Sequence, residues 1–247
     1  IRRQVAQAIS PVSAHQRHPN GKLRLAWQSD HISAVTSIDM DLRTSGALDF
    51  AGGTVVHINA GMAALAAALV LGKRQGFPEN ISPPHSLPFA ALGAGLLWFG
   101  WFGFNAGSAL GAGALATNAF VVTHVATASA GFTWALLDWI FNSRPTLLGM
   151  ITGAVAGLVA ITPASGFVNC IGSIWIGIGA ALFCYISVAF IKTRFGYDDS
   201  LDAFGVHGIG GIWGALATGL WATVSVNSAG ANGLFYGNAG QILIQAK

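Results

Sequence analysis

Long apolar runs follow one another along the chain after Asp49, and they restrict its fold more than any other feature. A helix that crosses the hydrocarbon core of a bilayer needs about 20 mostly apolar residues. Five runs are close to this length or exceed it, one is shorter, and a last one is incomplete. They cover residues 51–72, 86–106, 116–141, 146–162, 168–191, 201–226 and the segment from about 234 onward. The pattern predicts an all-α, polytopic membrane helix bundle with about six complete transmembrane helices and a partial one.

The composition points to the same environment. Charged residues make up 9% of the chain and apolar residues 53%, whereas a soluble domain carries roughly 25% charged residues. So few charged side chains could not cover the surface of a soluble globule. We therefore expect a multi-pass protein of the cell (inner or plasma) membrane, in contact with the lipid bilayer.

The basic residues between the runs alternate from one connection to the next. Connections 107–115, 163–167 and 227–233 contain no Lys or Arg. The intervening connections contain five, namely Lys73, Arg74, Arg144, Lys192 and Arg194. Basic residues concentrate on the cytoplasmic side of membrane proteins. The first run is therefore predicted to pass from outside to inside, and each later run alternates.

Residues 1–48 differ from the rest of the chain. They contain nine of its 21 charged residues and no apolar run long enough to span a membrane. We expect an atypical, polar and basic segment with irregular structure, followed by a transmembrane domain over residues 49–247. The segment lacks the interleaved aromatic residues and the motifs of nucleic-acid binding, so no nucleic-acid partner is expected.

His57 and His207 lie inside predicted spans, where ionisable residues are costly and usually functional. His57 is six or seven residues into a span that enters from outside, and His207 is at a similar depth in one that enters from inside. The two side chains can therefore meet near the middle of the membrane, share a hydrogen bond and line one pore. The alternative is that they are two separate core histidines.

Other ionisable residues have simpler interpretations. Asp49 and Asp202 directly precede two spans, where a carboxylate caps the positive end of a helix. Asp138 is expected to pair with Arg144 across the following turn. For His124, within the third span, we favour packing or contact with lipid.

An aromatic run, Trp98-Phe-Gly-Trp101-Phe-Gly-Phe104, lies in the outer half of the second predicted span. It is interpreted either as an interfacial aromatic belt or as rings that close a pore or hold a cation. Two histidines without a neighbouring carboxylate or cysteine ligand make a poor metal site. We therefore expect no metal, no cofactor and no enzymatic activity. The missing Asn-Pro-Ala motif disfavours a water channel.

Three blocks of sequence closely resemble the Amt/Mep/Rh ammonium transporter family, and its bacterial Amt branch in particular. They are Asp49-Phe-Ala-Gly-Gly-Thr-Val-Val-His57-Ile-Asn, Gly100-Trp-Phe-Gly-Phe104-Asn-Ala-Gly-Ser108 and Asp202-Ala-Phe-Gly-Val-His207-Gly. They occur in family order over residues 46–247. The resemblance implies an eleven-helix fold, a homotrimer with one pore per subunit, and transport of ammonium or ammonia in nitrogen uptake.

The resemblance also implies roles for individual residues of the pore. His57 and His207 match the twin histidines that line its dry centre. Phe104 matches one of two stacked gate phenylalanines, and Trp101 matches a pore-lining tryptophan.

Two further residues match the outer end of the family's pore. Ser108 corresponds to the serine of the outer ammonium-recruitment site, and Asp49 to a structural aspartate beside it. Ser37 stands where the family has a recruitment tryptophan.

The runs in this chain correspond to helices five to eleven of the family, and neither the first four helices nor the tail that contacts a P-II-type signalling protein is expected here. The resemblance therefore predicts an N-terminally truncated or frame-shifted fragment. Two alternatives to transport stay open: a non-functional fragment of a transporter, or an ammonium sensor that uses the same pore domain.

Overall fold

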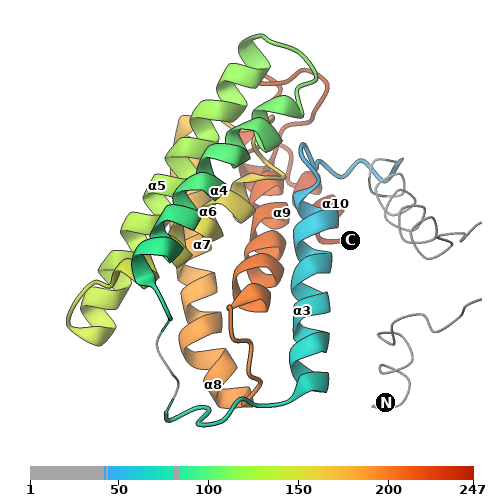
Figure 1. The fold of residues 1–247 in the computed structure, drawn as a ribbon. Helices are drawn as coiled ribbons and strands as arrows, with labels where there is room; N and C mark the ends of the chain where they lie inside the picture. The colour runs from blue at the N-terminus through green and yellow to red at the C-terminus, as the bar shows by residue number, and fades with distance from the viewer. Residues whose placement is uncertain (1–41, 43, 81–83) are drawn as a thin grey trace, which may run out of the picture.

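The computed structural model describes residues 42, 44–80 and 84–247, and within them it contains helices and turns but no strand (Figure 1). The predicted all-α class is therefore confirmed. The irregular structure expected for residues 1–48 concerns a segment that lies almost wholly outside the described residues.

In the described part of the chain, four helical segments are long and apolar enough to cross a membrane. They are Gly53–Leu71, Leu87–Gly107, Ala114–Asn142 and Cys170–Phe195. The first consists of η1 (Gly53–His57) and α3 (Ile58–Leu71), the second is α4, and the third is α5. The fourth consists of α7 (Cys170–Ile186), η2 (Ser187–Ile191) and α8 (Lys192–Phe195).

The other expected spans are shorter in the structure. The fourth run forms α6 (Leu147–Ile161), and the sixth forms η3 (Phe204–Gly208) and α9 (Ile209–Trp221). The sixth helix thus ends at Trp221, five residues before the predicted boundary at 226, because the backbone becomes extended at Ala222. After η4 (Leu234–Tyr236), the partial last run forms α10 (Gly240–Ala246).

Side-chain caps fix where three of these helices begin. The side-chain oxygens of Ser86, Thr146 and Asn169 accept hydrogen bonds from backbone N–H groups in the first turns of α4, α6 and α7. Such a cap satisfies a donor that has no partner within the helix and contributes about 1 kcal/mol. Polar residues at the edges of the apolar runs therefore set the helix register.

Helices α5, α6 and α7 pack together, and α6 and α7 also contact α9 (Figure 1). Helix α3 lies along η3 and α9 on the other side of the molecule. Small residues allow the close approach of α5 and α6, because a Cβ at Gly157 would meet the backbone of Ala126 and Thr127. Close packing of small residues in this way is typical of membrane helices.

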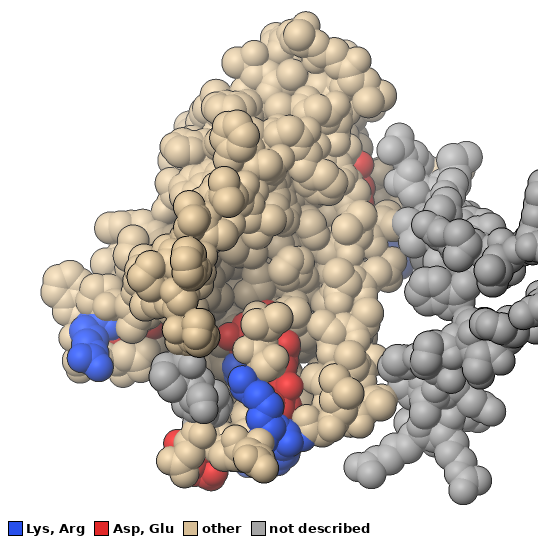
Figure 2. Space-filling view, in the orientation of Figure 1, with Lys and Arg blue, Asp and Glu red and all other residues tan. Residues whose placement is uncertain are grey.

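Among the residues that the structure describes, most of the basic side chains gather at one end of the bundle, the lower end in Figure 2. This end contains the connection after α3, the connection between α5 and α6, and α8. The connections between α4 and α5 and between α6 and α7 lie at the opposite end. The predicted alternation of the connections is therefore reproduced in space, and the positive-inside rule assigns the basic end to the cytoplasm.

The expected pairing of Asp138 with Arg144 is wrong. Asp138 is buried, and its carboxylate accepts hydrogen bonds from the backbone N–H and the hydroxyl of Thr146, at 3.3 and 2.7 Å. It also accepts one from the side-chain amide of Asn142 at 3.2 Å. These neutral donors are fixed by the turn, so the arginine side chain stays exposed.

Candidate functional site

The structure brings His57 and His207 together in the interior of the described bundle. Their ring centroids are 5.7 Å apart, and the ring planes are inclined at 69°. Each histidine lies in a π-helical turn, His57 at the end of η1 and His207 within η3. Such turns are rare and often mark functional sites. The predicted shared hydrogen bond is not found among the described residues, because the two rings are in contact without one and His57 Nε2 lies 3.3 Å from the hydroxyl of Thr162.

Two glycines make the approach of the histidines possible, because the helices that carry them cross almost in backbone contact. A Cβ on Gly61 would collide with the backbone of Gly208, and a Cβ on Gly211 would meet Ile58 and the Cβ of His57. Each glycine follows its histidine by four residues, so the contact is reciprocal. Any larger residue at either position would push the two rings apart.

A carboxylate stands eight residues before each histidine and holds the start of its helix. Asp49 Oδ2 accepts hydrogen bonds from the backbone N–H groups of Thr54 and Val55, at 2.9 and 3.3 Å. Asp199 accepts hydrogen bonds from those of Ala203 and Phe204, at 3.0 and 2.7 Å. These acceptors satisfy N–H groups that begin a helix, and their charge is favourable at its positive end.

The expectation that Asp202 caps the second of these helices is therefore wrong. Asp202 adopts a left-handed backbone conformation with φ of 56°, and its carboxylate forms an ion pair with Lys192. Asp199 takes the capping position instead. The sequence contained a signal for this, because Asp49 precedes His57 by the same eight residues that separate Asp199 from His207.

Aromatic side chains of α4 cover one side of His57. The ring of Trp101 stacks on it with centroids 5.2 Å apart and an interplanar angle of 29°. The ring of Phe104 lies 6.2 Å from His57 and 5.8 Å from Trp101. The indole N–H of Trp101 donates a hydrogen bond of 2.9 Å to the hydroxyl of Thr162, which sequence reasoning did not single out. The predicted pore residues thus form one cluster.

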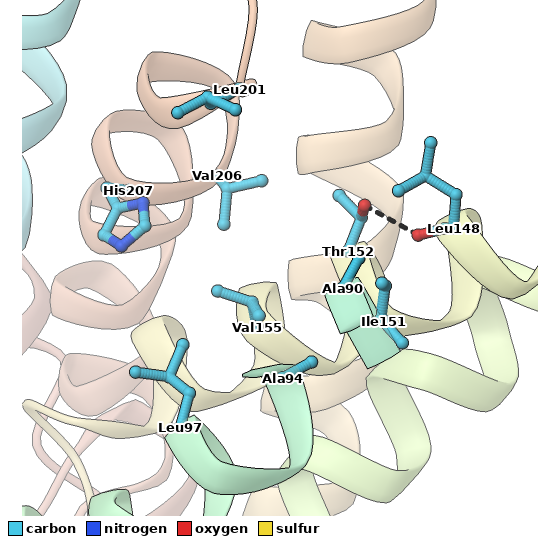
Figure 3. A pocket seen from close by; sticks show the side chains of 10 residues that line it. All are labelled: Ala90, Ala94, Leu97, Leu148, Ile151, Thr152, Val155, Leu201, Val206 and His207. Carbon is cyan, nitrogen blue, oxygen red and sulfur yellow. Dashed lines mark hydrogen bonds between the residues drawn. The ribbon is translucent and has the colours of Figure 1, made fainter. Parts of the chain in front are cut away.

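Two apolar hollows lie beside the histidine pair. One, of about 360 Å³, is lined by His57, Trp101 and Phe104 together with other α4 residues. The other, of about 250 Å³, is lined by His207, Val206 and apolar residues of α4 and α6 (Figure 3). Leu97 belongs to both linings. Each hollow thus includes one of the two histidines, and the two linings share a residue of α4.

Thr152 is one of the few polar residues of the second hollow, and its hydroxyl donates to the carbonyl of Leu148 in its own helix, as Figure 3 shows. A hydroxyl bonded in this way is satisfied locally and offers little to a passing solute. The wall opposite His207 is therefore effectively apolar.

The remaining predicted site residues lie farther from the histidines. Ser108 follows the last turn of α4, and its hydroxyl donates a hydrogen bond of 2.8 Å to the carbonyl of Phe104. No contact joins Ser108 to Asp49 in the described part of the chain, so the structure does not bring these two together. His124 is exposed on α5, with its ring 5.2 Å from that of Trp98 and away from the histidine pair.

An ion pair at the basic end ties α3 to the loop that precedes η3. The guanidinium of Arg74 donates to both carboxylate oxygens of Asp198 at 2.7–3.0 Å, and the backbone N–H of Arg74 also donates to this carboxylate. The hydrogen bonds from the Arg74 side chain are the main cause that lowers the pKa of Asp198 from its ordinary value of 3.8. The paired carboxylate directly precedes Asp199, so it anchors the segment that positions His207.

Apolar helices long enough to span a bilayer surround the histidine pair, and the basic connections lie at one end only, an arrangement that is typical of a multi-pass membrane protein. The chain belongs to the Ammonium Transporter Family, whose model matches residues 32–247. It is a multi-pass plasma membrane protein.

Several curated relatives are similar over most of the chain. It is 58% identical over 197 residues to the ammonium transporter of Bacillus subtilis, covering 80% of this chain and 48% of that protein. It is 56% identical over 204 residues to the ammonium transporter of Aquifex aeolicus, covering 83% of this chain and 47% of the relative. The chain therefore spans about half the length of the curated relatives it matches.

Solved structures agree with this assignment. The crystal structure of Saccharomyces cerevisiae Mep2 is similar with a TM-score of 0.76 at 36% identity, over 83% of this chain and 48% of that one. A structure described as a sensor Amt protein is similar with a TM-score of 0.74 at 35% identity, over 83% and 51% of the two chains.

Proposed function

We propose that this chain forms part of a pore for ammonium or ammonia in the plasma membrane, and that its central element is the pair of His57 and His207. The observation that supports this most strongly is the contact of two imidazoles, one buried (His57) and one half-buried (His207), beside apolar hollows in a chain of this family. We propose that residues 49–247 supply the transmembrane part of the pathway.

The energetics of the pathway favour a neutral species at its centre. Moving an ammonium ion into an apolar medium without its hydration shell costs on the order of tens of kcal/mol by Born solvation. Ammonia carries no charge and crosses the same region at far lower cost. The ion would therefore lose a proton before the apolar centre, and a neutral imidazole, which has one donor and one acceptor, can receive and pass on that proton.

The outer residues would act before this step. The rings of Trp101 and Phe104 present π faces that attract a cation, and they lie next to His57. Ser108, one turn beyond Phe104, would offer a hydroxyl oxygen in place of lost water. Asp49 would favour the cation from a distance, while its carboxylate stays occupied by the start of η1.

Uptake into proteoliposomes tests the proposal. When ammonium is added outside liposomes that contain the purified chain, entering ammonia should raise the internal pH. This rise should be faster than in protein-free liposomes. A chain with Trp101→Ala should differ from the unmodified chain in rate at equal protein content. Rates equal to those of empty liposomes, with a folded helical chain present, would favour the non-functional fragment.

Ammonium sensing is the second candidate, and it is supported by the likeness to the structure described as a sensor Amt protein. A sensor would bind the solute without passing it. Binding of ammonium or methylammonium, detected as a change in tryptophan fluorescence, with no flux in liposomes would favour this candidate over transport.

The resemblance to the family also supports a proposal about assembly. We propose that the chain associates as a homotrimer. Native mass spectrometry in detergent would reveal the trimer. A chain that is monomeric at all detergent concentrations would contradict it.

A further inference from the structure

The side chain of Thr162 contacts the ring of His57. The proposed function gives this threonine no role. It follows the last residue of α6 and has no exposed surface. Its side-chain oxygen lies 2.7 Å from the carbonyl oxygen of Leu158, 2.9 Å from Nε1 of Trp101 and 3.3 Å from Nε2 of His57. One buried hydroxyl therefore has three partners on three different segments.

The chemistry of these partners decides where the protons are. A threonine hydroxyl has one proton to donate and two lone pairs that accept. The carbonyl of Leu158 can only accept, so the hydroxyl donates its proton there. The indole N–H of Trp101 can only donate, so it takes one of the two lone pairs.

One lone pair then remains for His57. If Nε2 of His57 carried no proton, its lone pair would face the remaining lone pair of the Thr162 oxygen, which is repulsive. A protonated Nε2 instead donates a hydrogen bond to that oxygen. The geometry therefore requires the proton of a neutral His57 to be on Nε2. Nδ1 is left with the free lone pair of that ring.

The hydroxyl has little freedom to rotate away from Leu158. Leu158 is among the last four residues of α6, whose carbonyls lack partners in the helix. The backbone N–H of Thr162, which an α-helix would direct to Leu158, instead donates to Val159 at 3.2 Å. The hydroxyl takes its place, and turning it toward His57 would leave a buried carbonyl unsatisfied.

The backbone that carries Thr162 is also fixed relative to η1. The carbonyl of Pro163 accepts a hydrogen bond of 3.0 Å from the backbone N–H of Phe50. Gly53, which begins η1, packs against the Pro163 ring so closely that a Cβ there would collide with it. The distance between the hydroxyl and His57 is thus held by the fold rather than by the side chain alone.

We infer that Thr162 is a positioning residue that holds neutral His57 as the Nε2–H tautomer and so makes Nδ1 the atom that receives and returns a proton. The inference deepens the proposed function. The role of Nδ1 in proton transfer rests on that function, whereas the tautomer itself does not depend on transport. The same hydroxyl holds Trp101, so one oxygen orients both rings that are stacked on each other.

Nitrogen NMR of the full chain in lipid bilayers, with ¹⁵N-labelled histidine, tests the tautomer directly, because protonated and bare ring nitrogens resonate far apart. The His57 signals are assigned by their loss in His57→Gln. We expect the unmodified chain to show a protonated Nε2 and a bare Nδ1. A protonated Nδ1 and bare Nε2 in the unmodified chain would overturn the inference without any variant.

Two substitutions provide the matched comparison. Thr162→Val keeps the shape but removes the hydroxyl, and it should shift the ratio of the two tautomers by about tenfold. Thr162→Ser keeps the hydroxyl and should preserve the unmodified spectrum. An unchanged tautomer in Thr162→Val would contradict the inference.

Flux measurements on the same samples separate the two levels of the proposal. A tautomer shift in Thr162→Val together with slower ammonium-driven flux, restored in Thr162→Ser, supports both the positioning role and transport. A tautomer shift in a chain that carries no flux in its unmodified form supports the role of Thr162 and contradicts the proposed function.

Discussion

Gly61 lies against the backbone of Gly208, so closely that no side chain fits between α3 and η3. We predict that Gly61→Ala destabilises the chain by about 2 kcal/mol, because the added methyl group forces packed backbones apart. It should also separate His57 from His207. Thermal unfolding in detergent measures the first effect.

Gly93→Ala is the matched control for this substitution. Gly93 lies within α4, and a Cβ there meets nothing within 4 Å in the described structure. Replacing an unconstrained helical glycine by alanine should stabilise the helix by up to about 1 kcal/mol. Equal losses of stability in both variants would show that the contact between Gly61 and Gly208 is not the cause.

His57→Ala should abolish proton-coupled, ammonium-driven current in a membrane that contains the complete pore. The reason is that the substitution removes one of the two imidazoles through which we propose the proton passes. Current on a solid-supported membrane after an ammonium pulse provides the measurement. His124→Ala is the control, since His124 is also a histidine of the bundle but is exposed on α5, and its current should stay unchanged. Wild-type current in the His57 variant would rule out a relay.

Removing the cap at Asp199 should cost more than removing the carboxylate of Asp202. Asp199→Ala leaves two backbone N–H groups at the start of η3 without their acceptor, which costs on the order of 1–2 kcal/mol. Asp202→Ala removes an ion pair with Lys192 that is partly exposed, and such pairs contribute at most about 1 kcal/mol. A lower unfolding temperature for Asp202→Ala than for Asp199→Ala would indicate that Asp202, and not Asp199, caps the helix.

Arg74→Ala should destabilise the basic end by on the order of 2 kcal/mol, because it leaves the buried carboxylate of Asp198 without its charged donor. Arg144→Ala, in an exposed loop, should have little effect. Hydrogen exchange of the amides in the loop before η3 would localise the change. Protection of this loop that does not change in Arg74→Ala would mean that the ion pair does not anchor it.

The same ion pair predicts a pH dependence with a definite sign. The pKa of Asp198 is lower in the folded chain than its ordinary value of 3.8, chiefly because of the hydrogen bonds from Arg74. Its contribution to stability is therefore fully present above the unfolded pKa and is lost as the pH falls through the folded pKa. The stability difference between the unmodified chain and Asp198→Asn should shrink as the pH is lowered from about 7 to about 3, an interval that contains the ordinary Asp value. If this stability difference instead grew as the pH was lowered, the predicted stabilising role of the Asp198 carboxylate would be wrong.

Patterns that depend on neighbouring residues were readable from the sequence. Apolar runs and alternating basic connections predicted the spans and their direction, because lipid and water act on each segment separately. The opposite directions of two spans predicted that His57 and His207 could meet. The end of α9 was placed five residues too late because residues 222–226 continue the apolar run without remaining helical.

Features that depend on the three-dimensional meeting of distant segments were not readable. Thr162 is 105 residues from His57 and 61 from Trp101 in sequence, and nothing in its own neighbourhood indicates that it meets both. The cap at Asp199 is a different case, because the eight-residue spacing signalled it, whereas the left-handed backbone that accompanies it at Asp202 is one that a non-glycine residue rarely adopts. The acidic partner of Arg74 likewise lies 124 residues away.

The two halves of the histidine pair are built alike, each with a carboxylate eight residues before it, a π-helical turn and a glycine four residues after it. A solute arriving from either face of the membrane would therefore meet the same backbone frame, and this frame by itself has no preferred direction. Thr162 breaks the equivalence, since its hydroxyl lies against His57. A proton shared by the pair would then have two resting places of unequal energy, and that oxygen atom, together with the rings of Trp101 and Phe104 on the His57 side, would be a source of any rectification of flow at this centre.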